Sequence, residues 1–293
     1  MSASTSVPTA PGGTLRLGDR PISRLGFGAM QLAGPGVMGP PRDPEAARAV
    51  LRGVVDLGVT HLDTSDFYGP HLTNQLIREV LHPYPEDLVI VTKVGARRND
   101  KGDWLPAVRP DLLVSAVEDN LRHLGLEALD VVNLRVMPPI AGEQRFLEAF
   151  GVLADLVHQG KVRHLGLSEV DGEHVRLART IAPVVCVQNE YNLARRDHDP
   201  LIDLLAADGH GTVFVPYFPL GGFTPLQSRI LDDVAAARGA TPQTVALAWL
   251  LQRSPNIAVI PGTSNPDHLR ANVAAADVVL TEEELLELEG IGG

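Results

Sequence analysis

The feature that most constrains this chain is a regular alternation of two kinds of segment. Short runs rich in Val, Ile and Leu, such as residues 87–94 (DLVIVTKV), are followed by longer stretches with apolar residues at three- and four-residue spacing, such as 109–125. Short apolar runs are typical of buried strands, and the longer spacing is typical of amphipathic helices. Repeated along the chain, the pattern predicts about eight strand-then-helix units.

The predicted elements begin with a short hairpin that leads into a strand within residues 14–32. Further strands are predicted at 59–64, 87–94, 129–136, 162–168, 183–188, 211–217 and 257–262. Helices are predicted at 43–58, 72–81, 109–125, 143–160, 171–181, 199–209, 225–239, 241–254, 266–277 and 282–291. The loop 33–43, AGPGVMGPPRD, is too rich in Gly and Pro for regular structure.

This order of elements favours a closed parallel sheet. Strands that alternate with helices form a parallel sheet with right-handed crossovers, and eight such units close into a barrel. The alternative is a doubly wound open sheet, which usually carries G-x-G-x-x-G after its first strand. The corresponding segment, LGFGAMQLAG, does not match that motif. The sequence therefore predicts an α/β fold, a (β/α)8 TIM barrel with a short N-terminal hairpin.

Length and composition favour one domain. The chain has 293 residues, 44% of them hydrophobic, which suffices for one large core. We assign residues 14–293 to a single barrel domain. Residues 1–13, MSASTSVPTAPGG, lack the hydrophobic centre of a signal peptide and are expected to form a disordered tail.

Charge and rare residues exclude several classes of partner. A formal net charge of −11 argues against nucleic acid and anionic membranes, and no apolar run approaches the length of a membrane span. The single cysteine, Cys186, excludes an internal disulfide and is expected to be a buried, inert thiol. We expect a cytoplasmic protein without a metal, since the following histidines lack ligand spacing and are expected on the surface or in loops: His61, His71, His82, His158 and His164.

Charged residues end three of the predicted strands. Asp63, Lys93 and Arg135 each follow an apolar run, and the active site of a barrel lies at the carboxyl ends of its strands. Read alone, Asp63 would be a helix cap or a solvated carboxylate, and Lys93 a salt-bridge partner. Three charges of mixed sign around one barrel mouth can instead pair and shift one another's pKa values.

The orientation of Arg135 depends on strand register. In DVVNLRVMPP, residues 130–139, Asn133 and Arg135 share one side of the strand and Leu134 the other. If the apolar residues face the helices, Arg135 points into the barrel. Alternatively Arg135 turns outward, or it only neutralises a carboxylate such as Asp66.

Tyr68 is the candidate proton donor. A phenol has a pKa near 10 in water, which is high for proton transfer at neutral pH. We expect the Lys93 ammonium to lower the pKa of Tyr68, and Asp63 to keep Lys93 charged and oriented. Such a relay suits general acid catalysis, for example protonation of the alkoxide formed when a carbonyl accepts hydride.

A family resemblance supports this interpretation. HLDTSDFYG, followed by VTKVG, GLSE, QNEYN, PLGG and IPGTSNPDHLRAN, resembles the aldo-keto reductase superfamily from about residue 14 to 291. Within it, VVNLRVM, VCVQNEYN and PLGGFTPLQ look most like bacterial pyridoxal reductases. The resemblance implies a barrel that binds NADPH without a Rossmann domain and transfers hydride to an aldehyde or ketone, with pyridoxal reduced to pyridoxine as the expected reaction.

The resemblance also implies a catalytic tetrad. Asp63, Tyr68 and Lys93 match three of its members. The fourth is normally a histidine, and an alignment without gaps places Arg135 there. A gap of one residue would place Leu134 there instead.

The resemblance also implies which residues bind the cofactor. The resemblance assigns Ser168 and Gln188 to the carboxamide, Tyr217 to stacking on the nicotinamide, and Leu220 and Gly221 to the pyrophosphate. Gly28, at the end of the first strand, is included in the cofactor site. The adenosine phosphate end is assigned to Thr263, Ser264, His268 and Asn272, at a helix start that is a ready anion site.

Three positions depart from the family pattern. Glu169 replaces a usual asparagine, Gly262 a frequent lysine and His268 a frequent arginine. The last two weaken the expected cation for NADPH. Two other functions stay open: a nucleotide-binding, redox-sensing regulatory subunit with slow turnover, which the altered tetrad would allow, and a barrel lyase that uses Lys93 as a Schiff base.

Overall fold

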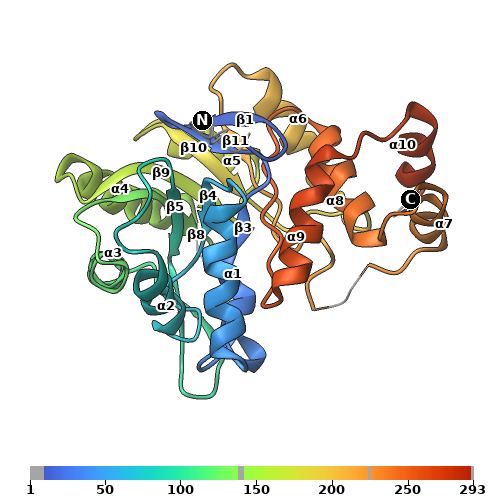
Figure 1. Ribbon diagram of the computed structural model, residues 1–293. Helices are drawn as coiled ribbons and strands as arrows, with labels where there is room; N and C mark the ends of the chain where they lie inside the picture. The colour runs from blue at the N-terminus through green and yellow to red at the C-terminus, as the bar shows by residue number, and fades with distance from the viewer. Residues whose placement is uncertain (1–9, 138–141, 224–225, 292–293) are drawn as a thin grey trace, which may run out of the picture.

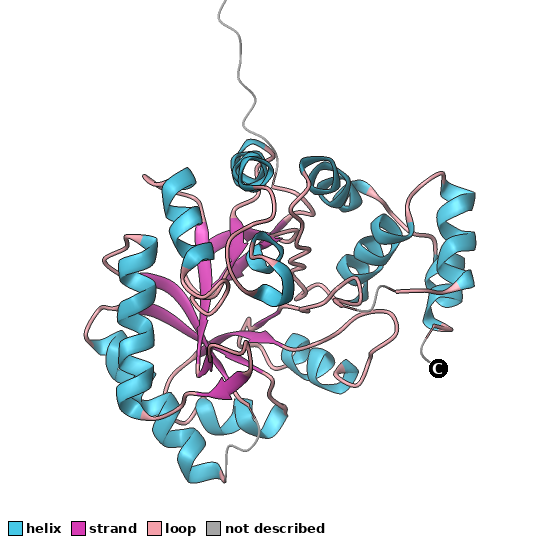
Figure 2. Cartoon of the chain, turned by 90° about the horizontal axis from the view of Figure 1, so that it is seen from below, coloured by secondary structure: helices cyan, strands magenta, loops and turns pink. Residues whose placement is uncertain are grey.

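The computed structural model describes residues 10–137, 142–223 and 226–291. Strands occupy its centre and helices surround them (Figure 2). Within the described residues one parallel sheet of seven strands runs in the order β11 (Val213–Phe214), β10 (Val184–Gln188), β9 (Val162–Ser168), β8 (Leu129–Arg135), β5 (Val89–Val94), β4 (His61–Asp63) and β3 (Phe27–Gly28). Strands adjacent in this order follow one another along the chain as predicted, apart from a small hairpin between β5 and β8.

The predicted last strand is not a regular strand, but its segment closes the barrel. Leu25 forms a parallel bridge with Val259, just before β3, and Phe214 forms one with Ile257, next to β11. Pro261 has no N–H to donate, so the ladder cannot continue through it. The (β/α)8 prediction is thus confirmed, with an extended segment in the eighth position.

Helices follow the strands around the barrel (Figure 1). Their bounds are α1 (Pro44–Asp56), α2 (Leu72–Leu81), α3 (Pro110–Leu124), α4 (Glu143–His158), α5 (Gly172–Ala178), α6 (Asp199–Ala207), α7 (Arg229–Arg238), α8 (Pro242–Arg253), α9 (Pro266–Ala274) and α10 (Glu282–Glu289). Short 3-10 turns span Ala29–Leu32, Pro35–Val37 and Ala275–Asp277. In the described ranges, none of the helices has the length and hydropathy needed to cross a bilayer.

Capping residues explain where α1 begins and where α3 ends. The Asp43 side chain accepts a hydrogen bond from the backbone N–H of Ala46 and starts α1. Gly125 ends α3 in the left-handed conformation, with φ of 69°. Both ends were predicted from the sequence, because these caps depend on local chemistry.

An N-terminal hairpin seals one end of the barrel. Strands β1 (Thr14–Leu17) and β2 (Arg20–Ser23) pair antiparallel, as predicted. Their side chains Leu17 and Ile22 are buried against Val91, Val131 and Cys186, which lie inside the barrel. Cys186 is buried as predicted, and burial raises the pKa of its thiol to about 12, so it stays protonated.

Part of the expected N-terminal tail lies against the barrel. Residues 1–9 are outside the described residues. Residues 10–13 form a turn in which the Gly13 N–H donates to the Ala10 carbonyl. The Leu25 N–H donates to the Pro11 carbonyl at 3.1 Å, so this turn is tied to the chain just before β3.

A second hairpin stands where the sequence suggested only a loop. Strands β6 (Ala96–Arg98) and β7 (Trp104–Pro106) pair antiparallel after β5. The Asn99 Oδ1 atom accepts from the backbone N–H groups of Lys101 and Asp103, which shapes the turn. The hairpin carries Trp104 toward the carboxyl end of the sheet.

His61 is buried in the barrel, so its expected surface position is wrong. It precedes Asp63 by two residues on β4 and points to the same side. Neither ring nitrogen has a hydrogen-bond partner among the described residues. Burial lowers the pKa of His61 to about 4, so the ring is neutral in the folded protein at neutral pH.

This buried histidine should make stability fall in mild acid. As pH falls from about 6.5 the unfolded state gains a proton on His61, whereas the folded state gains it only near a pKa of about 4. The free energy of unfolding should therefore drop by about 3 kcal/mol across that window from His61 alone. Urea unfolding of the wild type, His61→Gln and a control, His158→Gln at an exposed position of α4, would measure it. Equal pH slopes for wild type and His61→Gln would refute this assignment.

Candidate active site

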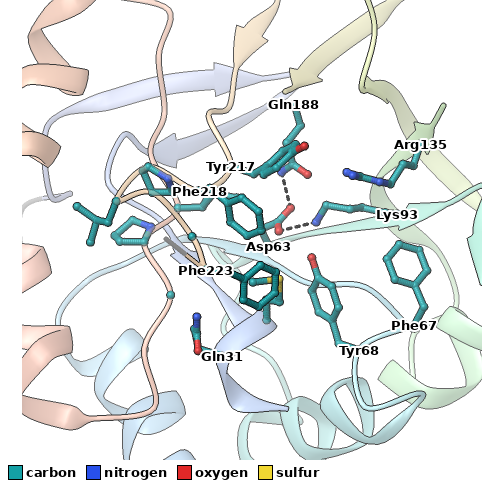
Figure 3. A pocket seen from close by; sticks show the side chains of 18 of the residues that line it. Gln31, Asp63, Phe67, Tyr68, Lys93, Arg135, Gln188, Tyr217, Phe218 and Phe223 are labelled. Carbon is teal, nitrogen blue, oxygen red and sulfur yellow. Dashed lines mark hydrogen bonds and ion pairs between the residues drawn. The ribbon is translucent and has the colours of Figure 1, made fainter. Parts of the chain in front are cut away.

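The centre of the site is a buried ion pair between neighbouring strands. Lys93 on β5 donates from Nζ to Asp63 Oδ1 at 2.5 Å and to the Thr64 carbonyl at 3.0 Å. The second carboxylate oxygen of Asp63 accepts from Gln188 Nε2 at 2.8 Å (Figure 3). Asp63 ends β4, and alternation turns it into the barrel together with Lys93. The strand ends thus bring these three polar side chains together.

The ion pair keeps Lys93 charged. Burial acts to lower the pKa of its ammonium, but the Asp63 carboxylate acts in the opposite direction and the net pKa is raised. An amine held as an ammonium is a poor nucleophile. This arrangement argues against a Schiff-base role for Lys93.

Tyr68 lies beside this pair in the loop after β4. Its ring is buried, with Lys93 Nζ 5.5 Å from the ring centroid. Burial raises the pKa of Tyr68 and outweighs the lowering effect of Lys93. The expectation of a lowered pKa is therefore wrong, because desolvation of the phenolate by burial has a larger effect on the pKa than the nearby Lys93 charge. A phenol that keeps its proton at neutral pH can still act as a donor.

Arg135 points into the barrel from the end of β8. Leu134 is fully buried in the core shared with the outer helices, so alternation places Arg135 on the inner side with Asn133. The Arg135 Nη1 atom donates to Ser168 Oγ at 3.2 Å. Its guanidinium lies 5.2 Å from the centre of the Tyr217 ring. The inward register is thus found, and the outward alternative is wrong.

Arg135 also does not pair with Asp66. The Asp66 carboxylate is bonded to His71 and His123, at 2.7 and 2.8 Å. Among the described residues Arg135 has no acidic partner within salt-bridge distance. A guanidinium that is inside a barrel mouth and has no carboxylate partner is free to bind an oxygen of a ligand.

These side chains line one cavity of about 440 Å³ at the barrel mouth. Its lining includes the predicted residues Gly28, Asp63, Tyr68, Lys93, Arg135, Gln188, Tyr217 and Leu220. Ser168 is buried behind this lining and reaches it through Arg135. The other predicted cofactor residues lie outside the lining: Gly221, Thr263, Ser264, His268 and Asn272.

Most of the apolar lining was not predicted from the sequence. Phe67 packs edge-on against Trp104, with ring centroids 5.2 Å apart. Phe218 packs against Phe223, which is 70% exposed at the mouth. These residues come from the loop after β4, the β6–β7 hairpin and the segment after β11, and no sequence periodicity brings them together. The cavity therefore has polar groups on the strand side and aromatic side chains on the loop side (Figure 3).

The chain offers groups that fit a nicotinamide carboxamide. Gln188 Oε1 is buried and has no hydrogen-bond partner among the described residues, so it can accept from an amide. Ser168 Oγ accepts from Arg135 and keeps its own hydrogen free to donate. Glu169, which replaces the usual asparagine, adopts φ of 63°, a left-handed conformation that asparagine tolerates better.

The start of α9 fits an anion less completely. Asn265 caps the helix by accepting from the Asp267 N–H, and Thr263 Oγ1 accepts from the Asn265 N–H. These contacts confirm the predicted helix start. His268 is exposed, and Arg270 is paired with Asp267 at 2.8 Å. A phosphate here would meet one exposed histidine and one arginine that already has an acidic partner.

Comparisons with known proteins agree with this geometry. Residues 24–292 match the family described as "Aldo/keto reductase family". The chain is 60% identical over 284 residues to pyridoxine 4-dehydrogenase of Escherichia coli strain K12, covering 95% of this chain and 98% of that protein. A thermostable aldo-keto reductase crystallised with the inhibitor epalrestat is similar in structure, with a TM-score of 0.81, 29% identity, and coverage of 95% of this chain and 99% of that one. An aldo-keto reductase from Klebsiella pneumoniae in complex with NADP and acetate has a TM-score of 0.77, 25% identity, and coverage of 95% of both chains.

Proposed function

The chain belongs to the aldo/keto reductase family, and from this membership we propose that it is an NADPH-dependent carbonyl reductase that interconverts pyridoxal and pyridoxine. It is an oxidoreductase acting on carbonyl and CH–OH groups, as its family implies. The substrate proposal is supported by the 60% identity to the E. coli pyridoxine 4-dehydrogenase. The cofactor proposal is supported by structural relatives crystallised with NADP or NADPH.

The observation that carries the proposal is the grouping of Asp63, Lys93, Tyr68 and Arg135 around one cavity. When bound, NADPH would supply the hydride. The carbonyl oxygen, which gains negative charge as its carbon is reduced, would take its proton from the Tyr68 hydroxyl. Lys93, fixed by Asp63, would stabilise the resulting phenolate. Water at the cavity mouth would then return a proton to Tyr68.

The residues at the cavity mouth suit a flat aromatic aldehyde. Phe67, Trp104 and Phe218 offer ring faces and edges of the kind that pack well against an aromatic ring. Arg135 lies on the same side of the cavity as Lys93 and can bind an oxygen. A small apolar aldehyde would leave most of these aromatic contacts unmade.

A substrate panel tests this function. The rate of NADPH oxidation should be highest with pyridoxal and lower with aliphatic aldehydes and simple ketones, and NADP with pyridoxine should give the reverse reaction. Slow turnover with every carbonyl, together with tight NADPH binding, would instead favour the redox-sensing regulatory subunit. Borohydride trapping of substrate on Lys93 would favour the lyase, against which the raised pKa of Lys93 argues.

NADPH should bind more tightly than NADH. The reason is the capped start of α9, whose N–H groups and hydroxyls can hold a phosphate, with His268 nearby. Charged hydrogen bonds contribute roughly 1.5–3 kcal/mol each, so one or two of them give a difference of about 10–100-fold or more. Fluorescence titration with both cofactors measures it. Equal dissociation constants for the two cofactors would contradict this assignment.

A small carbonyl compound fits the family and the cavity. We propose a cytoplasmic enzyme that needs neither nucleic acid nor a membrane, a view that rests on the acidic net charge and the single, buried cysteine. Fractionation of cells that express the protein, followed by activity measurement, would test the location.

A further inference from the structure

A second group of polar side chains lies outside the catalytic cavity, where the loop after β4 meets α2 and α3. It consists of Asp66, His71 and His123, and we call it the Asp66 cluster. Asp66 Oδ2 is 2.7 Å from His71 Nδ1, and Asp66 Oδ1 is 2.8 Å from His123 Nδ1. The two imidazole rings have centroids 4.7 Å apart. The chemistry proposed above uses none of these three residues.

From this geometry we propose that the Asp66 cluster binds one divalent transition-metal ion of the Zn²⁺ type. Two imidazole nitrogens and one carboxylate oxygen are a common ligand set for such ions. One ligand atom from each residue lies within 4.8 Å of the others. In a tetrahedral site with bonds of about 2.0–2.1 Å, ligand atoms are about 3.3 Å apart. The two contacts of 2.7 and 2.8 Å, which involve different oxygens of Asp66, would have to open by about half an ångström. Ligand atoms that are up to 4.8 Å apart would have to close toward the same spacing, so small side-chain rotations must accompany binding.

The surroundings hold the carboxylate in place. Asn74 Nδ2 donates to Asp66 Oδ1 at 3.2 Å, and also donates to Asn120 Oδ1 at 3.0 Å. Asn120 in turn accepts from the Thr92 hydroxyl at 2.6 Å. Metal-binding carboxylates are typically oriented by such outer hydrogen bonds. The side chain of Asp66 is 9% exposed, so it is largely preorganised before any ion arrives.

The cluster is also accessible. The His71 side chain is 50% exposed, and its backbone, with φ of 69°, starts α2 without using the ring as a cap. His123 borders an open surface depression between α2 and α3, two helices that lie side by side (Figure 1). A hydrated ion can therefore reach the ring nitrogens from solvent, and water can complete its coordination.

One neighbouring cation opposes binding. Arg122 donates to His123 Nε2 at 3.3 Å, which fixes the proton of that ring on Nδ1. Coordination through Nδ1 requires the other tautomer, so Arg122 must turn away. Its side chain is 67% exposed and is already paired with Asp119 at 2.6 Å, so this movement needs no change in the core.

Calorimetric titration of tag-free protein with ZnCl₂ tests the proposal. We expect saturable binding of one ion per chain and a rise in melting temperature. His71→Asn and His123→Asn keep an N–H donor near the position of Nδ1 but remove the metal ligand. Each should weaken Zn²⁺ binding by more than the roughly 10–100-fold that loss of an outer hydrogen-bonding partner costs. His210→Asn, at an exposed loop position, is the matched control and should bind like the wild type.

A cluster held only by hydrogen bonds predicts different results. In that case Zn²⁺ would show no saturable binding of one ion per chain, or both histidine variants would bind it as the wild type does, and either result overturns the proposal. If a variant does not fold, spectra of histidine side chains labelled with ¹⁵N in the wild type decide. Zn²⁺ should then shift the ring nitrogens of two histidines, and unchanged spectra would refute the site.

Discussion

Replacing Tyr68 with Phe should abolish carbonyl reduction while NADPH binding survives. The phenol is the proton donor proposed for the carbonyl oxygen, and loss of a general acid typically costs about 10²–10⁴-fold in rate. Tyr68 lies against Lys93 in the cavity, whereas the groups proposed to hold the carboxamide, Ser168 and Gln188, are on other strands. Steady-state rates with pyridoxal and fluorescence titration with NADPH, on the same preparation, measure the two properties separately.

A second tyrosine provides the control for this substitution. Tyr84 is half-buried and donates to the Leu124 carbonyl at 2.7 Å, away from the cavity. Tyr84→Phe removes one hydroxyl of the same kind and should leave kcat/KM unchanged, although it lowers stability by about 1 kcal/mol. If Tyr68→Phe kept most of the wild-type rate, Tyr68 would have no place in the mechanism.

Replacing Arg135 with Met should lower kcat/KM by roughly 10²–10³-fold with little change in cofactor affinity, as expected when a donor to a developing oxyanion is lost. Arg135 lines the cavity at the barrel mouth, at the strand end where the resemblance to the family implies a histidine. A guanidinium stays charged across the usable pH range and offers several donors. Because arginine does not give up its proton at these pH values, the pH optimum should stay in place.

The contacts of Arg135 suggest a second role, in positioning the cofactor, which the same experiment distinguishes from the first. Arg135 also lies against Tyr217 and bonds to Ser168, so it could act by positioning the cofactor side of the site. In that case Arg135→Met would raise the dissociation constant of NADPH, which would defeat the assignment to the substrate oxygen. Arg163→Met, on the exposed part of β9, removes an arginine outside the cavity and should change neither quantity.

Local chemistry and strand parity made much of this fold and site predictable. The start of α1 at the Asp43 cap and the end of α3 at Gly125 follow from residues within a few positions of each end. The inward direction of Arg135 follows from the apolar residues that alternate with it, because a shift by one residue would have placed Leu134 in the cavity. Asp63 and Lys93 meet because adjacent parallel strands end at the same edge.

Properties that depend on packing between distant segments could not be read from the sequence. The raised pKa of Tyr68 arises from burial, and the depth of burial is set by loops without a repeating pattern. His61 looked like one of several scattered histidines until the register of β4 placed it inside the barrel. The Asp66 cluster needs residues from a loop, a helix start and the next helix, and His123 is 57 residues from Asp66 along the chain.

The hairpin that seals one end of the barrel restricts how molecules enter and leave the cavity. Since Leu17 and Ile22 fill the far end, the described residues close the barrel at that end, and the cavity opens at the carboxyl ends of the strands. Two molecules that react there cannot enter from opposite sides. If one of them lies deeper than the other, we expect it to arrive first and depart last, so that the order of binding and release follows from the closed end of the barrel as well as from affinity.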